Sequence, residues 1–267
     1  MSEQKMLVLD IDGTLTNSKK EITPATKKAI RKIQEDGHVV VIASGRPTPG
    51  TAKVANELQL DRTGGFVLSY NGARITDWKT KEIIYQNTLD AQVPSTLYEY
   101  ASENNLGLVT YQEQNVVTGT RHDDYMEMEA RINEIPIVDV DNFSEFVDFD
   151  VNKCLLTAPV DVAKEHEDAI ADMLPNANVC RSEPFFIEVM PQGVDKAASL
   201  DRLVQILNMK QENTICCGDG FNDLSMIQYA GVGVAMENAQ EEVKSKADFI
   251  TKSNDEDGIV HVIDTFF

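Results

Sequence analysis

An apolar run ends in two acids in the segment Met6-Leu7-Val8-Leu9-Asp10-Ile11-Asp12-Gly13-Thr14-Leu15. A short unbroken apolar run is typical of a strand that is buried on both faces, as strands of parallel sheets are. Ligands of open α/β sheets bind beyond the carboxyl ends of the strands, where Asp10 and Asp12 are expected to lie. Residues two apart in extended backbone point the same way, so these two like charges need a compensating cation or proton.

Strand and helix patterns alternate from this segment to residue 81. Thr23-Pro24 supplies an N-cap and a first-turn proline, and Gly37 ends the helix that they begin. Strands are expected at Val39–Ala43 and Phe66–Ser69, with a helix over 49–58 between them. This order predicts right-handed crossovers and a doubly wound, Rossmann-like parallel sheet with helices on both faces.

The same texture returns after residue 190. A helix is expected over 196–207, then a buried strand over 214–217, a helix near Asp223, and short strands over 231–235 and 249–250. The intervening residues look different: a helix over 93–103 precedes two alternating segments, 106–111 and 115–119, that predict a hairpin. We therefore expect a core built from residues 1–81 and 190–267, interrupted by an α+β domain over 82–189.

Net charge supports this division and restricts the partners. The 267 residues carry 24 basic and 44 acidic side chains, a net charge of −20, and residues 82–189 account for −17 of it, with 5 basic and 22 acidic side chains. Binding to nucleic acid or to an anionic membrane needs surplus Lys and Arg, so neither partner is expected. The apolar runs are too short for a signal peptide or a membrane span, and the four cysteines lack CxxC spacing. We expect a cytoplasmic monomer or homodimer with reduced thiols.

Polar side chains also follow two other predicted core strands. Ser44, Gly45 and Arg46 come after the second strand, and Gly218-Asp219-Gly220-Phe221-Asn222-Asp223 follows the strand over 214–217. At one edge of a parallel sheet these ends would bring Asp10, Asp12, Ser44, Asp219 and Asp223 together. Such an oxygen-rich site suits Mg²⁺, while Lys196 and Ser44 suit a phosphate. Phosphate loops of the GxxxxGK[ST] type are absent, as are GxGxxG fingerprints that open a helix. The residues therefore predict phosphoryl transfer.

These residues resemble the four motifs of the haloacid dehalogenase superfamily of phosphohydrolases. The matching positions, in chain order, are Asp10-Ile11-Asp12-Gly13-Thr14, Ser44, Lys196, and the segment from Gly218 to Asp223. The long insertion looks like the α/β cap, the substrate-specificity domain, of the Cof-type sugar phosphatases of subfamily IIB. One departure is Ala197, because many relatives place Gly after the lysine.

The resemblance implies a role for each matched position. Asp10 would be the nucleophile that forms an aspartyl-phosphate, and Asp12 would act first as general acid and then as general base. Mg²⁺ would be held by the Asp10 carboxylate, the Asp12 backbone carbonyl and Asp219. Asp223 would support the metal or orient Lys196, and Arg46 would support the site without contacting phosphate. The phosphoryl oxygens would be bound by Ser44, Gly45, Lys196 and Asn222.

The expected function is Mg²⁺-dependent hydrolysis of small phosphorylated metabolites, with sugar phosphates as the favoured class. Two alternatives remain. A phosphomutase would return the aspartyl-phosphate to a sugar instead of to water, and a binding protein of the same fold would hold a phosphorylated ligand without turnover.

Overall fold

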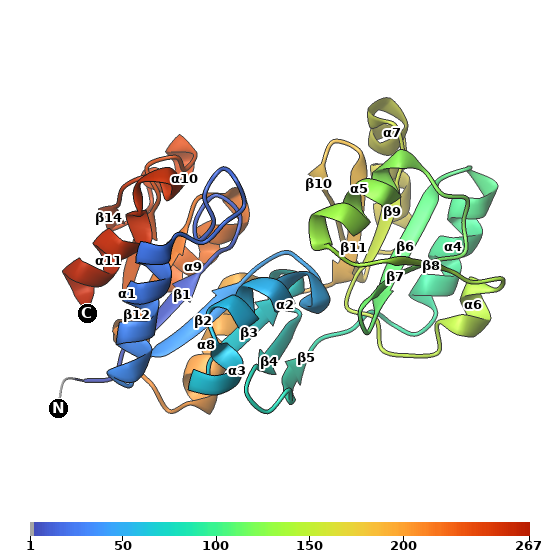
Figure 1. Ribbon diagram of the computed structural model, residues 1–267. Coiled ribbons are helices and arrows are strands. Elements are labelled where there is room, and N and C mark those ends of the chain that lie inside the picture. Colours follow the sequence, from blue (N-terminus) through green and yellow to red (C-terminus); the bar gives the residue numbers. More distant parts are fainter. Residues whose placement is uncertain (1–2) are drawn as a thin grey trace. The chain divides into compact units, whose positions relative to one another are not determined.

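Strand β1 (Met6–Leu9) lies inside an eight-stranded sheet in this computed structural model, which describes residues 3–267. The strand order is β14-β13-β12-β1-β2-β3-β4-β5 (Figure 1). The other strands are β2 (Val39–Ala43), β3 (Phe66–Ser69), β4 (Arg74–Asp77), β5 (Ile83–Gln86), β12 (Thr214–Gly218), β13 (Val232–Ala235) and β14 (Phe249–Ile250). All neighbours from β14 to β3 are parallel, which confirms the predicted α/β fold class.

Helices cover both faces of this sheet. They are α1 (Pro24–Glu35), α2 (Thr48–Glu57), α3 (Leu60–Thr63), α8 (Lys196–Ile206), α9 (Leu224–Tyr229), α10 (Glu241–Lys244) and α11 (Gly258–Phe266). Helix α1 begins as the sequence predicts, because the Thr23 side chain accepts a hydrogen bond from the Thr26 N–H and Pro24 occupies the first turn.

The alternation of side chains along β1 and β2 separates two apolar clusters. Leu7, Leu9, Val40 and Ile42 pack with residues of α1, α2 and α11, whereas Met6, Val8, Val41 and Ala43 pack with residues of α8. Since both faces of these strands are buried, the runs Met6–Leu9 and Val39–Ala43 are apolar at nearly every position.

Strands β4 and β5 extend the sheet beyond the predicted core. β4 runs antiparallel to β3, with Leu68 opposite Ile75, and the chain turns back through Asp77–Glu82 into β5. The first unit of the fold accordingly extends to Tyr85 and resumes at Asp195, and the second unit is Gln86–Val194. The sequence predicts these boundaries at residues 82 and 190, where texture and charge change, so the two divisions differ by four residues at the first boundary and by five at the second.

The second unit has its own six-stranded sheet, in the order β10-β11-β9-β6-β7-β8. Its strands are β6 (Gly107–Gln112), β7 (Asn115–Thr118), β8 (Ile137–Asp139), β9 (Cys154–Thr157), β10 (Ala177–Glu183) and β11 (Phe186–Pro191). Its helices are α4 (Val93–Glu103), α5 (Asp124–Asn133), α6 (Phe143–Phe146) and α7 (Val160–Met173). β6 and β7 pair antiparallel, which confirms the predicted hairpin. A separate apolar cluster forms the core of this unit.

Two further observations concern the predicted environment of the chain. Among residues 3–267, the helices are all too short or too polar to cross a bilayer. All four cysteines are free thiols, and Cys180 is only half-buried, whereas the other three are buried.

Replacing Ile42 by Ala should lower the free energy of unfolding by about 2–5 kcal/mol. The Ile42 side chain is fully buried in the apolar cluster, so truncating it leaves a cavity there. Trp78, the single tryptophan, is buried in the first unit, so its fluorescence in a urea titration reports on this unit. Ile206→Ala is the matched control: Ile206 is 49% exposed, and a change of about 0.5 kcal/mol or less is expected. Equal losses in the two variants would contradict this description of the core.

Candidate functional site

The carboxyl ends of β1, β2 and β12 carry the predicted residues other than Lys196, which begins α8, and all of these residues belong to the first unit. β1 pairs with β12 from Met6 opposite Thr214 to Leu9 opposite Cys217. The Asp10 N–H continues this pairing by donating to the Cys217 carbonyl at 3.1 Å. Because the two strands end at the same level, the acids that follow them are brought together.

The Lys196 ammonium is the centre of the acidic cluster. Its Nζ donates to Asp10 Oδ1 at 2.8 Å and to Asp223 Oδ1 at 2.6 Å, and all three side chains are buried. Burial alone would lower the pKa of Lys196, but the charges of Asp10 and Asp223 raise it, so the amine stays protonated. Asp195 fixes the start of α8 by accepting hydrogen bonds from the N–H groups of Ala197 and Ala198. This cap orders the turn despite the absence of the usual glycine.

Asp219, which follows β12, is held beside this cluster by contacts with the turn after Asp12. Thr14 Oγ1 donates to Asp219 Oδ1 at 2.7 Å, and Gly13 adopts a left-handed conformation with φ of 81°. A Cβ atom on Gly13 would lie 2.4 Å from Asp219 Oδ2. Glycine is therefore required at this position for both its conformation and its size.

Asp223 links the loop after β12 to Lys196. While its Oδ1 accepts from Lys196, its Oδ2 accepts from the N–H groups of Asp219 and Gly220, each at 3.0 Å. Gly218 permits this turn, since a Cβ atom there would lie 2.4 Å from Asp223 Cβ. Both oxygens of Asp223 are thus engaged by the protein itself.

The geometry of the three acids fits a divalent cation. Asp10, Asp219 and Asp223 each offer an oxygen, and these oxygens lie within 4.8 Å of one another. Burial, reinforced by Asp223, raises the pKa of Asp10 to about 7, and burial raises that of Asp219 to about 6. Three carboxylates against one ammonium leave two uncompensated negative charges, which one divalent cation balances. Carboxylate oxygens are also the ligands that Mg²⁺ prefers.

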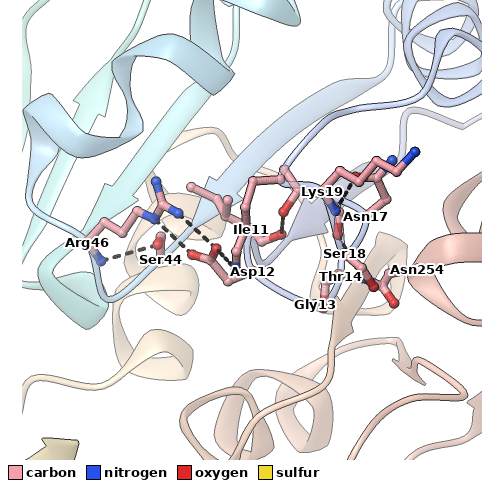
Figure 2. Close-up of polar contacts among 12 residues, drawn as sticks. Ile11, Asp12, Gly13, Thr14, Asn17, Ser18, Lys19, Ser44, Arg46 and Asn254 are labelled. Carbon is pink, nitrogen blue, oxygen red and sulfur yellow. Dashed lines mark hydrogen bonds and ion pairs between the residues drawn. The ribbon is translucent and has the colours of Figure 1, made fainter. Parts of the chain in front are cut away.

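The side chain of Asp12 does not join this cluster, contrary to the expected convergence of all the strand-end acids. Arg46 binds its carboxylate through two hydrogen bonds of 2.8 Å, from Nε to Oδ2 and from Nη2 to Oδ1 (Figure 2). Lys20 Nζ donates to Oδ1, also at 2.8 Å. Burial would raise the pKa of Asp12, but Arg46 and Lys20 together lower it. The two parallel hydrogen bonds from Arg46 attract the Asp12 carboxylate strongly, whereas the carboxylates of Asp10 and Asp219 repel it. The Asp12 side chain therefore lies with Arg46 and outside the acidic cluster.

Ser44, Gly45 and Asn222 form a second cluster around Asn71. The Asn71 N–H donates to the Ser44 carbonyl at 3.0 Å, and Asn222 Nδ2 donates to Asn71 Oδ1 at 3.3 Å. Gly45 lies against the same amide, with 3.1 Å between a built Cβ and Asn71 Oδ1. Ser44 Oγ accepts from the Arg46 N–H at 3.2 Å, and within residues 3–267 its own hydrogen is donated to no other group, so it can be donated to a ligand.

Sequence reasoning assigned no role to three residues that shape the site: Thr14, Lys20 and Asn71. Asn71 follows the carboxyl end of β3, so the strand-end argument used for β1, β2 and β12 would have found it. Thr14 stands in the quoted motif, but only the fold brings Asp219 to it. Lys20 lies in a surface turn with a left-handed backbone, and its spacing from Asp12 gives no signal.

Comparisons with known proteins match residues 7–263 to the family described as haloacid dehalogenase-like hydrolase. The Bacillus subtilis 5-amino-6-(5-phospho-D-ribitylamino)uracil phosphatase YcsE is 29% identical over 259 residues, which cover 97% of this chain and 94% of that protein. The crystal structure of a haloacid dehalogenase-like hydrolase from Bacteroides thetaiotaomicron is 45% identical, with a TM-score of 0.96 over 99% of this chain and 100% of its own. A structure of the subclass IIB sugar phosphatase BT4131 is 27% identical, with a TM-score of 0.81 over 98% and 99% of the two chains.

Asp219→Asn should stabilise the metal-free protein at pH 7.5, measured as the thermal midpoint in the presence of a chelator. The pKa of Asp219 is about 6 in the folded protein and near its ordinary value in the unfolded chain, so the folded state binds more protons between about pH 4 and pH 6. Wild-type stability therefore falls as the pH rises through this window. The advantage of the Asn variant should be present above pH 6 and disappear toward pH 4.

Asp61→Asn serves as the control for this pH series, because Asp61 is an exposed acid on α3. Its thermal midpoint should follow that of the wild type at every pH. An Asp219→Asn variant that is less stable than the wild type at pH 7.5 without metal would contradict the charge assignment.

Proposed function

The chain belongs to the haloacid dehalogenase-like hydrolase family and is a phosphatase, and on this premise we propose that it hydrolyses small phosphorylated metabolites in an Mg²⁺-dependent reaction. We propose sugar phosphates and related compounds as the substrate class. Two similar proteins support this choice, since one is named for a phosphoribityl substrate and the other as a sugar phosphatase. Both names describe a phosphate ester on a polyhydroxylated carbon chain. The inserted unit, Gln86–Val194, is proposed to select among such substrates.

The observation that carries the mechanism is the asymmetric environment of the Asp10 carboxylate. Lys196 holds Oδ1, and within residues 3–267 no hydrogen bond reaches Oδ2. A buried, positioned carboxylate oxygen with no competing donor is suited to attack phosphorus. In the first step Asp10 forms an acyl phosphate, and the bond from phosphorus to the leaving oxygen breaks. In the second step water attacks phosphorus and restores the Asp10 carboxylate.

Asp12 is assigned the proton transfers of both steps. It gives a proton to the leaving oxygen in the first step and removes one from the attacking water in the second. Arg46 and Lys20 lower the pKa of Asp12 and so favour its ionised form, and the proposal therefore includes that substrate binding loosens these pairs before the proton is transferred. Arg46 and Lys20 fix the direction of its carboxylate before substrate arrives. This assignment agrees with the separation of Asp12 from the acidic cluster, because a metal-bound carboxylate could not exchange protons freely.

Mg²⁺ would be held by the Asp10 carboxylate, Asp219 and the backbone carbonyl of Asp12. Asp223 is the less suitable ligand, because its two oxygens already bind Lys196 and two backbone N–H groups. When bound, the cation would neutralise charge on the phosphoryl group and so stabilise the transition state. The phosphoryl oxygens are assigned to Ser44, Gly45, Lys196 and Asn222.

We also propose that the enzyme works in the cytoplasm as a monomer or homodimer. The four free thiols support the location, because oxidising compartments favour disulfides.

Asp10→Asn should reduce phosphate release from p-nitrophenyl phosphate by about three orders of magnitude or more, because the amide cannot act as nucleophile. In the wild type, rapid acid quenching during turnover followed by peptide mass spectrometry should find one phosphoryl group on Asp10. Asp61→Asn should keep wild-type activity, and circular dichroism should show that both variants are folded. Undiminished release by Asp10→Asn would overturn the mechanism.

Hydrolase and phosphomutase activities are distinguished by the fate of the phosphoryl group. With a hexose phosphate as substrate, phosphorus NMR should show free phosphate and no positional isomer of the substrate. Accumulation of the isomer would assign the chain to the mutases, with the same Asp10 intermediate.

A chelator should abolish activity, and added Mg²⁺ should restore it. Mg²⁺ at about 100 times its dissociation constant should also stabilise the folded wild type by about 2.7 kcal/mol, visible as a rise in thermal midpoint. Asp219→Asn should lose most of this rise, because one ligand has lost its charge. A rise of equal size in both proteins would contradict the assignment of Asp219 as a ligand.

A further inference from the structure

Side chains from the end of the sequence hold the loop that carries Asp12. Asn238 Nδ2 donates to the Gly13 carbonyl at 2.8 Å, and Asn254 Nδ2 donates to the Thr16 carbonyl at 2.9 Å. The Asn254 N–H donates to Asn238 Oδ1 at 3.0 Å, which joins the two asparagines. We call these three hydrogen bonds the asparagine brace. Figure 2 shows Asn254 among the polar contacts of this loop.

The brace binds the loop next to the backbone contact between Asp12 and Thr16, at Gly13 and at Thr16 itself. Asp12 and Thr16 form an isolated parallel bridge, so the backbone of Asp12 is held against that of Thr16. Gly13 follows Asp12 directly, and its left-handed backbone sets the direction of the carbonyl that Asn238 binds. The brace therefore fixes the two backbone segments between which Asp12 is placed, while Arg46 and Lys20 fix its carboxylate.

The two asparagines reach the loop from the segments that follow β13 and β14. Asn238 follows β13 and Asn254 follows β14, and the Thr251 N–H joins these segments by donating to the Ala235 carbonyl at 3.0 Å. Asn238 is exposed and Asn254 is half-buried. Hydrogen bonds between such groups add little net stability, because water satisfies the same groups in the unfolded chain. Their effect on the position of a reacting group can be much larger, since misplacement by about 1 Å can cost about 100-fold in rate.

We propose that Asn238 and Asn254 are positioning residues that keep Asp12 within reach of the leaving-group oxygen. The inference rests on the proposed role of Asp12 as proton donor and adds two residues to which no motif or comparison gives a role. Loss of the brace displaces the segment of Asp12, while Asp10 and Lys196 keep their own contacts. Because this segment also carries the backbone carbonyl assigned to Mg²⁺, the test is made at saturating Mg²⁺.

The test compares substrates that differ in their need for a proton donor. p-Nitrophenolate is a weak base and leaves without much protonation, whereas the alkoxide of an alkyl phosphate needs a proton. The parameter is kcat/KM, which covers the steps up to departure of the leaving group. In Asn238→Ala and Asn254→Ala it should fall about 10- to 100-fold for the alkyl phosphate and about 3-fold or less for p-nitrophenyl phosphate.

Two further variants separate positioning from general loosening. Asn238→Asp keeps the shape but loses the donor, so it should show the same selective loss as Asn238→Ala. Gln34→Ala removes another side-chain amide that joins two segments, since Gln34 Nε2 on α1 donates to the Leu58 carbonyl at 3.3 Å and to Thr63 Oγ1 at 2.9 Å. This control should keep wild-type kcat/KM for both substrates. The thermal midpoints of all four variants should fall by no more than about 2–4 °C.

Asp12→Asn distinguishes failure of this inference from failure of the proposed role of Asp12. If it loses the alkyl substrate selectively while the brace variants lose both substrates equally, or neither, the inference fails and the proposed function stands. If Asp12→Asn itself lacks selectivity, its role as proton donor fails, and the inference fails with it.

Discussion

The Lys196 ammonium donates to Asp10 and Asp223, and all three side chains are buried. Removing such charges from water costs several kcal/mol for each ion unless close partners compensate. The fold brings these partners together. The pairing of β1 with β12 places Asp10 and the loop of Asp223 side by side, and the N-cap of α8 fixes the turn that carries Lys196. One negative charge nevertheless stays unmatched within this trio, and Asp219 adds another. The folded chain thus keeps two uncompensated negative charges at this site, which a bound divalent cation would balance.

The acids of the site are separated by function as well as by position. Burial, reinforced by the neighbouring Asp223 carboxylate, raises the pKa of Asp10 and of Asp219. Asp12 has the opposite shift in pKa, because Arg46 and Lys20 outweigh the effect of its burial. Two carboxylates only two residues apart in the sequence therefore have different chemistry. The difference arises because Lys196 binds Asp10, whereas Arg46 and Lys20 bind Asp12.

Sequence reasoning predicted the parts of the molecule that follow from local pattern. Buried parallel strands have continuous apolar runs, and polar residues after such runs must meet at one sheet edge, so β1, β2 and β12 and their acids could be placed without a structure. Strands β4 and β5 were missed because short, half-exposed strands lack that signature. The contacts of the Asp12 loop were not predicted. Lys20 binds Asp12 through a surface turn whose spacing gives no signal. Asn238 and Asn254 bind Gly13 and Thr16 across more than 200 positions, and no residue spacing encodes such a contact between loops.

The pairing of β1 with β12 also sets an order of assembly. Residue 6 lies opposite residue 214, and the whole second unit lies between them in the chain. A contact of such sequence separation carries a large loop-closure cost and forms late. During synthesis from the N-terminus, β1 has β2 beside it long before β12 exists, while all strands of the second unit are already available to one another. The strand that bears Asp10 is thus an open sheet edge in the nascent chain, apolar on both faces, and such an edge is a site of aggregation until residues 214–218 close it.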